Sequence, residues 1–242
     1  PPADGAAASL DRQDTPPDQA PPSEPEPPAA HSFERLVETD VNRFAFLAAQ
    51  EIARKPSPQF RFLLVLGDHG VGKTALLEAT WRAALEAEAV RRPEHHAAEG
   101  WCNDYYHALQ TRRTRSFRQH HRNCDMLIMD GLQFVQGKPG AQDELLYTAK
   151  TLQSSGGRVV FSSTVHPHDL QEVNASFRNL LSEALWVELV TPSADEMERV
   201  AAELAALHRL RADAEVLGFL SERYPGSIQD LNAAVRSLAA FA

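Results

Sequence analysis

The chain has 242 residues, of which 43% are hydrophobic, so it can bury a sizeable core, and its formal net charge of -9 offers no global basic field for nucleic acid. Its two cysteines, Cys102 and Cys124, lie outside any CxxC spacing, which argues against a disulfide framework or a zinc site and favours a reducing compartment. No apolar stretch approaches membrane-spanning length and no signal peptide is visible, so we expect a cytoplasmic protein without a membrane span.

The N-terminal segment, residues 1–31, is rich in proline and acidic residues and has hardly an apolar side chain larger than alanine. Such a segment cannot bury enough surface to offset its ordering entropy. We expect a disordered tail or a linker, and the sequence leaves these two alternatives open.

Beyond the tail, predicted helices and strands alternate, which is typical of an α/β fold. Asp40 is expected to cap a helix that runs to Arg54. Short apolar runs predict buried strands at residues 60–66, 124–130, 157–163 and 185–190, and helices are expected at 75–89, 142–152 and 175–182. A further strand should precede Trp101, although residues 94–99 support it poorly. We therefore predict an α/β core over residues 32–191.

The last fifty residues change character, because strands stop and alanine-rich helices follow. Ser193 with Glu196, and Ser227 with Asp230, have the capping-box spacing that opens an amphipathic helix. A third helix is expected near residues 213–223. Residues 192–242 are therefore predicted to form a three-helix lid over a nucleotide.

The most informative motif lies between the strand at 60–66 and the helix that follows it. It reads Gly-Asp-His-Gly-Val-Gly-Lys-Thr, a phosphate-binding loop whose backbone N–H groups and helix end point at a polyphosphate. Lys73 adds charge, and Thr74 offers a hydroxyl to magnesium. The predicted nucleotide-binding residues are Gly67, Asp68, His69, Gly70, Val71, Gly72, Lys73, Thr74 and Ala75, with ATP or ADP and Mg²⁺ as cofactors.

The second nucleotide motif is Met126-Leu127-Ile128-Met129-Asp130, four apolar residues that end in an acid. At the carboxyl end of a strand beside the loop, Asp130 can hold the magnesium shell of a triphosphate. Active enzymes of this design usually place another acid next, to orient the attacking water. Gly131 stands there, so hydrolysis should be slow unless another residue substitutes.

These motifs resemble the AAA+ domain of the bacterial chromosomal replication initiator DnaA family, over residues 33–242. The stretches that carry the resemblance are Val41-Asn42-Arg43-Phe44-Ala45, the phosphate loop, Ala108-Leu109-Gln110, residues 117–122, Asp130-Gly131-Leu132-Gln133-Phe134, Gln142-Asp143-Glu144 and residues 227–234. The resemblance implies a P-loop NTPase with a five-stranded parallel sheet flanked by helices, a three-helix lid, ATP or ADP between them, and a role in opening or regulating a replication origin.

The chain departs from the family at four catalytic positions. Gly131 replaces a second acid, Thr164 replaces an acidic sensor, Ser182 aligns with the arginine finger although Arg178 matches an arginine one turn earlier, and Gln229 replaces the lid's sensor arginine. Joint loss of charges that stabilise phosphoryl transfer predicts a nucleotide-binding relative with impaired hydrolysis, so whether it is an enzyme stays open. Loss of the finger arginine, at the position of Ser182, also weakens the usual reason for ATP-dependent filaments, so self-association through AAA+ surfaces stays open.

A basic segment over residues 111–122 is a candidate DNA-binding surface. Arg112, Arg115, Arg118 and Arg122 recur at three- and four-residue steps, so one helix would align them, with Phe117 turned toward the core. The resemblance places a motif that touches single-stranded origin DNA in this region. The alternative is a solvated charged face.

Two histidine pairs, His95 with His96 and His120 with His121, are interpreted as surface residues. No carboxylate or cysteine pattern completes a metal site around them in the sequence, so no protein-only metal site is expected.

Two further functions stay open. One is an active AAA+ ATPase that remodels or loads a replication partner such as a helicase, which needs a water-orienting group besides Asp130. The other is a regulatory adaptor that contacts an initiator or a sliding clamp through its tail, although residues 1–30 contain no convincing clamp-binding peptide.

Overall fold

A computed structural model describes residues 31–54 and 60–241. Its centre is a five-stranded parallel sheet in the order β2-β3-β4-β1-β5. The strands are β1 (Phe62–Gly67), β2 (Pro93–Ala97), β3 (Met126–Asp130), β4 (Arg158–Ser163) and β5 (Leu185–Leu189). The sheet places β1 and β3, whose carboxyl ends carry the two nucleotide motifs, on either side of β4. The predicted α/β fold with a parallel sheet is confirmed.

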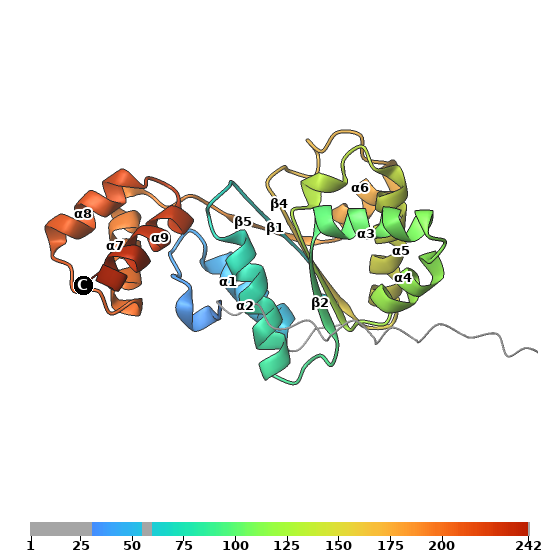
Figure 1. The fold of residues 1–242 in the computed structure, drawn as a ribbon, viewed down its shortest axis with the longest axis horizontal. Coiled ribbons are helices and arrows are strands. Elements are labelled where there is room, and N and C mark those ends of the chain that lie inside the picture. The colour runs from blue at the N-terminus through green and yellow to red at the C-terminus, as the bar shows by residue number, and fades with distance from the viewer. Residues whose placement is uncertain (1–30, 55–59, 242) are drawn as a thin grey trace, which may run out of the picture.

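Helices cover both faces of this sheet (Figure 1). One face carries α1 (Arg43–Arg54) and α2 (Lys73–Glu86), and the other carries α3 (Ala98–Gln110), α4 (Thr114–His121), α5 (Pro139–Ser154) and α6 (Ala175–Ser182). Short 3-10 helices lie at η1 (Phe33–Arg35) and η2 (Leu132–Val135). Because strand side chains alternate, Leu63 and Val65 face α1 and α2 while Leu64 faces the opposite layer.

Three helices follow the sheet: α7 (Ala194–Leu207), α8 (Ala214–Arg223) and α9 (Ile228–Phe241). They form a separate apolar cluster that includes Met197, Val200, Leu204, Leu220, Leu231 and Val235. The predicted capping box at Ser193 is present with both of its hydrogen bonds. The Ser227 hydroxyl accepts from the Asp230 backbone N–H at 3.2 Å, so the second predicted helix start is also confirmed.

The structure corrects the prediction of one continuous helix over residues 111–122. Helix α3 ends at Gln110, Arg112 has a left-handed backbone with φ 56°, and α4 begins only at Thr114. The strand that residues 94–99 supported poorly is present as β2, at one edge of the sheet.

Residues 1–30 of the predicted tail lie outside the described part of the chain, but its last residue, His31, is described and its Nδ1 lies 2.5 Å from Oε2 of Glu78. None of the described helices is long and apolar enough to cross a membrane.

Candidate nucleotide site

The phosphate loop connects β1 to α2, as its sequence context predicted. Gly67, Gly70 and Gly72 have φ of 151°, 80° and 102°, a region that side-chain-bearing residues rarely adopt. Gly70 also lies against the C-terminal helices, because a Cβ there would meet the Ser227 hydroxyl at 2.8 Å. The Gln229 backbone N–H donates to the Gly70 carbonyl at 3.2 Å. The loop and the start of α9 are therefore in direct contact.

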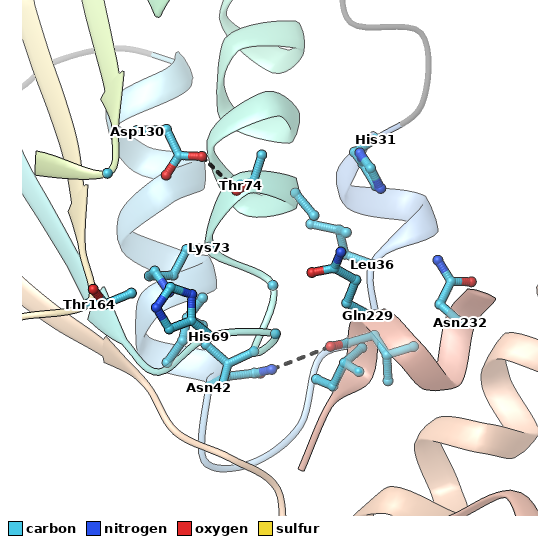
Figure 2. A pocket seen from close by; sticks show the side chains of 18 of the residues that line it. His31, Leu36, Asn42, His69, Lys73, Thr74, Asp130, Thr164, Gln229 and Asn232 are labelled. Atoms are coloured by element: carbon cyan, nitrogen blue, oxygen red, sulfur yellow. Dashed lines mark hydrogen bonds between the residues drawn. The ribbon is translucent and has the colours of Figure 1, made fainter. Parts of the chain in front are cut away.

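A cavity of about 500 Å³ lies over this loop (Figure 2). Of the predicted site residues, its wall includes His69, Gly70, Val71, Gly72, Lys73, Thr74, Ala75, Asp130, Gly131, Thr164 and Gln229. Gly67 and Asp68 do not line it, and neither does Ser182. The structure thus brings together residues from the loop, the end of β3, the end of β4 and the start of α9.

Lys73 is held inside the loop. Its side chain is 8% exposed, and its ammonium donates to the Asp68 carbonyl at 2.6 Å. Burial lowers the pKa of Lys73, and the charges of Asp130 and Asp68 oppose this effect. The loop therefore holds a largely buried cation at the wall of the cavity, where its charge would interact strongly with a bound anion.

Thr74 and Asp130 face each other at the end of β3. The Thr74 hydroxyl donates to Oδ2 of Asp130 at 2.6 Å, the contact drawn as a dashed line in Figure 2. The Ser162 hydroxyl donates to Oδ1 of the same carboxylate, which fixes its orientation. A hydroxyl and a carboxylate are hard oxygen ligands, so this pair fits Mg²⁺.

Gly131 occupies a backbone conformation that suits glycine. Its φ is 80°, its N–H donates to the Ser162 hydroxyl at 2.9 Å, and an added Cβ would meet the Phe134 ring at 3.1 Å. A side chain at position 131 would therefore be strained by the backbone and crowded by Phe134. In the described wall of the cavity the carboxylates are Asp130 and Glu99.

The other three departures differ in where they lie. Thr164 lines the cavity, and its N–H donates to the Gln133 side chain at 3.2 Å. Gln229 lines it at the start of α9. Ser182 is exposed away from it, and the Arg178 guanidinium donates to the carbonyls of Pro167 and Leu170 at 2.7 and 2.8 Å. Arg178 is thus occupied within its own chain.

Sequence reasoning missed much of the wall opposite the loop. These residues are His31, Arg35, Leu36, Val37, Phe46, Gln133, Leu204, Ile228 and Asn232. They come from segments far apart in the sequence. Gln133, Ile228 and Asn232 lie in stretches that carry the family resemblance, but no local motif marks the others. Asn42, also part of a stretch that carries the family resemblance, lines the cavity too, and its side chain accepts from the Thr39 N–H at 2.7 Å in the turn before α1.

The arginine segment divides into two parts. Arg118 and Arg122 donate to the two carboxylate oxygens of Glu144 at 2.8 and 2.6 Å, and the Glu144 side chain is 1% exposed. Arg112 lies in the turn between α3 and α4, and Arg115 is exposed on α4. The four arginines therefore do not form the single solvent-facing stripe that the spacing predicted. Phe117 packs toward the core, as expected.

The interpretation of the histidine pairs as surface residues is wrong for His121, which is 6% exposed. A carboxylate does accompany the histidines: Glu94 lies 2.5 Å from Nδ1 of His121 and 3.0 Å from Nε2 of His96. Burial opposes ionisation of Glu94, but hydrogen bonds from His121 and His96 outweigh it and lower its pKa to about 2. Burial lowers the pKa of His121, so a neutral imidazole donates to an ionised carboxylate.

The sheet order, the loop and the helical cluster that touches the loop define a P-loop nucleotide-binding domain of the AAA+ class. A family model described as the bacterial DnaA ATPase domain matches residues 28–188. The chain therefore belongs to the bacterial DnaA ATPase domain family.

Individual relatives agree with this assignment. The chromosomal replication initiator protein DnaA of Caulobacter sp. (strain K31) is 33% identical over 217 residues, which cover 86% of this chain and 44% of the relative. Domain III of the Thermotoga maritima replication initiation protein DnaA is 27% identical with a TM-score of 0.80, and the match covers 87% of this chain and 88% of that one. A replication initiator DnaA bound to AMPPCP and single-stranded DNA has a TM-score of 0.79 at 20% identity, covering 86% of this chain and 64% of that one. The chain spans less than half the length of the curated relatives it matches.

Proposed function

We propose that this chain is the nucleotide-binding part of a cytoplasmic protein that initiates or regulates bacterial DNA replication, and that it holds ATP or ADP with Mg²⁺ but hydrolyses ATP slowly. Residues 32–191 supply the core and residues 192–242 supply the lid. The observation that carries the proposal is the pairing of Thr74 with Asp130 at 2.6 Å beside the buried Lys73.

Each part of the cavity has a role in this proposal. The loop N–H groups and Lys73 receive the phosphates, Thr74 and Asp130 hold Mg²⁺, and the apolar side chains of Leu36, Phe46 and Leu204 form a wall suited to a base. When bound, Mg²⁺ neutralises charge on the phosphates. A replication initiator DnaA bound to AMPPCP shares the fold, which supports a nucleotide as the ligand.

Slow hydrolysis follows from the charges that the wall lacks. Gly131, Thr164 and Gln229 line the cavity, and all three are neutral at positions where the family resemblance implies charged side chains. Phosphoryl transfer depends on positioned charge, so the joint absence of these charges slows hydrolysis while the binding loop stays intact.

Nucleotide binding is tested with Lys73→Ala and a fluorescent ATP analogue. Loss of one partner of a buried charge pair costs about 2 kcal/mol or more, so we expect affinity to fall at least about thirtyfold. Lys150→Ala, on an exposed lysine of α5, is the matched control and should bind like the parent. Equal affinity of the parent and Lys73→Ala would refute the site.

An active ATPase that remodels or loads a replication partner is the second candidate, and Glu99 is the observation in its favour. This carboxylate lines the cavity at the start of α3 and is placed where it can reach water. Single-turnover hydrolysis with and without single-stranded DNA separates the two functions. Slow turnover that Glu99→Gln leaves unchanged supports the first, and brisk turnover that Glu99→Gln abolishes establishes the second.

Single-stranded or origin DNA, other replication proteins and further copies of this chain are the partners we propose. A replication initiator DnaA with single-stranded DNA has this fold, as does the DnaC helicase loader at 15% identity and a TM-score of 0.54. For the DNA, we assign the contact to Arg112 and Arg115, because Arg118 and Arg122 already pair with Glu144.

A further inference from the structure

Four side chains with metal-ligand chemistry meet between the sheet edge and the end of α4. Glu94 and His96 are two residues apart on β2, so they project from the same face of that strand. His121 is the last residue of α4 and His120 precedes it. The cluster therefore joins an edge strand to a helix on the layer that covers it.

The ligand atoms of Glu94, His96 and His121 all lie within 4.8 Å of one another. The Glu94 Oε2 atom is 3.0 Å from Nε2 of His96 and 2.5 Å from Nδ1 of His121. Ligands on tetrahedral zinc are roughly 3.3 Å apart, given bonds of about 2.0–2.1 Å. Small side-chain shifts would therefore open the three atoms around one ion.

The surroundings hold these side chains in place. Glu94 is 8% exposed and His121 is 6% exposed. The ring centroid of Phe117 is 4.3 Å from that of His121, and Trp101 packs on the same imidazole. The Cys124 thiol donates to the His121 carbonyl at 3.1 Å. A buried imidazole that is fixed by packing loses little freedom when it binds an ion.

A hydrogen-bonded cluster alone accounts for two of the histidines but not for the third. His96 and His121 saturate one oxygen of Glu94, whereas Nε2 of His120 lies 3.5 Å from the other oxygen, too far for a good hydrogen bond. The His120 side chain is 54% exposed and gives the cluster a solvent-facing side through which an ion can enter.

We propose that Glu94, His96 and His121 bind one Zn²⁺, with His120 or water as the fourth ligand. Imidazole nitrogens with a carboxylate oxygen are a common zinc ligand set, and hard ions such as Mg²⁺ prefer oxygen ligands throughout. The ion fastens α4 to β2. Because α4 also carries Arg115 and Arg118, zinc fixes the arginine segment on the sheet edge.

The test measures zinc bound to the full chain, freed of any histidine tag, stripped with EDTA and then equilibrated with Zn²⁺. Excess Mg²⁺ is present so that zinc does not occupy Thr74 and Asp130. We expect one zinc per chain, and in Glu94→Gln and His96→Gln at least a tenfold loss of affinity. His168→Gln is the matched control: His166 and His168 are an exposed pair whose ring centroids are 5.1 Å apart, and the described residues place no carboxylate between them. Absence of zinc, or equal binding in all variants, overturns the proposal.

Two measurements on the unmodified protein keep the proposal testable if a variant fails to fold. Co²⁺ in place of zinc should give the intense visible absorption of a tetrahedral ion, and a weak octahedral spectrum would overturn the assignment. Zinc at about one hundred times its Kd should raise Tm by about 5–10 °C over EDTA-treated protein, and an unchanged Tm would equally contradict it.

Discussion

We predict that Glu144→Gln destabilises the fold, because Glu144 pairs with two arginines of the arginine segment. The Glu144 carboxylate is 1% exposed and accepts charged hydrogen bonds from Arg118 and Arg122. The amide keeps one acceptor oxygen but loses the charge, which leaves two guanidinium groups beside a neutral group. The Nε atom of Arg122 is already buried without a hydrogen-bond partner, so that side chain cannot easily find a substitute.

The expected loss of unfolding free energy is about 2–3 kcal/mol. A hydrogen bond to a charged group contributes about 1.5–3 kcal/mol, and breaking a fully buried pair costs about 3–5 kcal/mol. We take a value below the latter, because the side chains of Arg118 and Arg122 are 47% and 30% exposed and water screens them.

Urea unfolding of the full chain measures this loss. Glu203→Gln, on an exposed glutamate in α7, is the matched control and should change stability by less than about 0.5 kcal/mol. A loss below about 1 kcal/mol in Glu144→Gln would refute the reasoning that these arginines are committed to the fold.

The same reasoning predicts which arginines bind DNA. Arg115→Ala should weaken binding of single-stranded DNA and reduce the slope of log affinity against log salt by about 0.7, since one phosphate contact is lost. Arg118→Ala should lower stability but leave this slope unchanged. The slopes are measured by fluorescence anisotropy over a salt series. Equal slopes in the two variants would contradict the assignment of Arg115 to DNA binding and of Arg118 to stability.

Three further predictions concern stability. Gly131→Ala should lower the free energy of unfolding by about 1–2 kcal/mol, because Gly131 has a left-handed φ. Gly218→Ala, in α8, should raise it by about 0.5–1 kcal/mol, because no atom lies within 4 Å of the added Cβ. Urea midpoints that shift in the same direction in both variants would contradict this. Ser193→Ala removes the cap of α7 and should cost about 0.5–2 kcal/mol, seen as faster amide exchange in α7, and unchanged exchange there would count against it. In EDTA, the contribution of Glu94 to the free energy of unfolding should be lost as pH falls from 4.5 toward 2, because folding lowers the pKa of Glu94 from 4.5 to about 2. Glu94→Gln should flatten the curve of stability against pH over this range. An unaltered curve would refute the assignment.

Local chemistry explains what the sequence could predict. Some features depend only on neighbours within a few residues, so the sequence alone predicts them. These are the glycine-rich loop, Asp130 at a strand end and the caps at Ser193 and Ser227. The apolar strands at the centre of the sheet could also be predicted, because burial on both faces requires continuous hydrophobic runs.

Features at the sheet edge and features that depend on long-range contacts could not be predicted from the sequence, and the reasons are physical. Strand β2 was poorly supported because Glu94, His95 and His96 are polar, yet polar residues are tolerated at a sheet edge where a helix end pairs with them. The break at Arg112 was hidden because a single residue with positive φ leaves the spacing of the arginines unchanged. His31 and Asn232 reach the cavity only through tertiary packing.

In the function we propose, nucleotide binding and turnover depend on separate groups, so that binding can persist where hydrolysis is slow. Lys73, Thr74 and Asp130 are each held by hydrogen bonds within the chain, so the binding half is organised before any ligand arrives. The contact between the loop and α9 uses the backbone of Gly70 and Gln229 and needs no charged side chain. Under the proposed function, a nucleotide can therefore still hold the lid against the loop, while Gly131, Thr164 and Gln229 add no charge beside the terminal phosphate. In the function we propose, the bound nucleotide therefore acts by ordering the loop and the start of α9 against each other, and turnover is not needed for that contact.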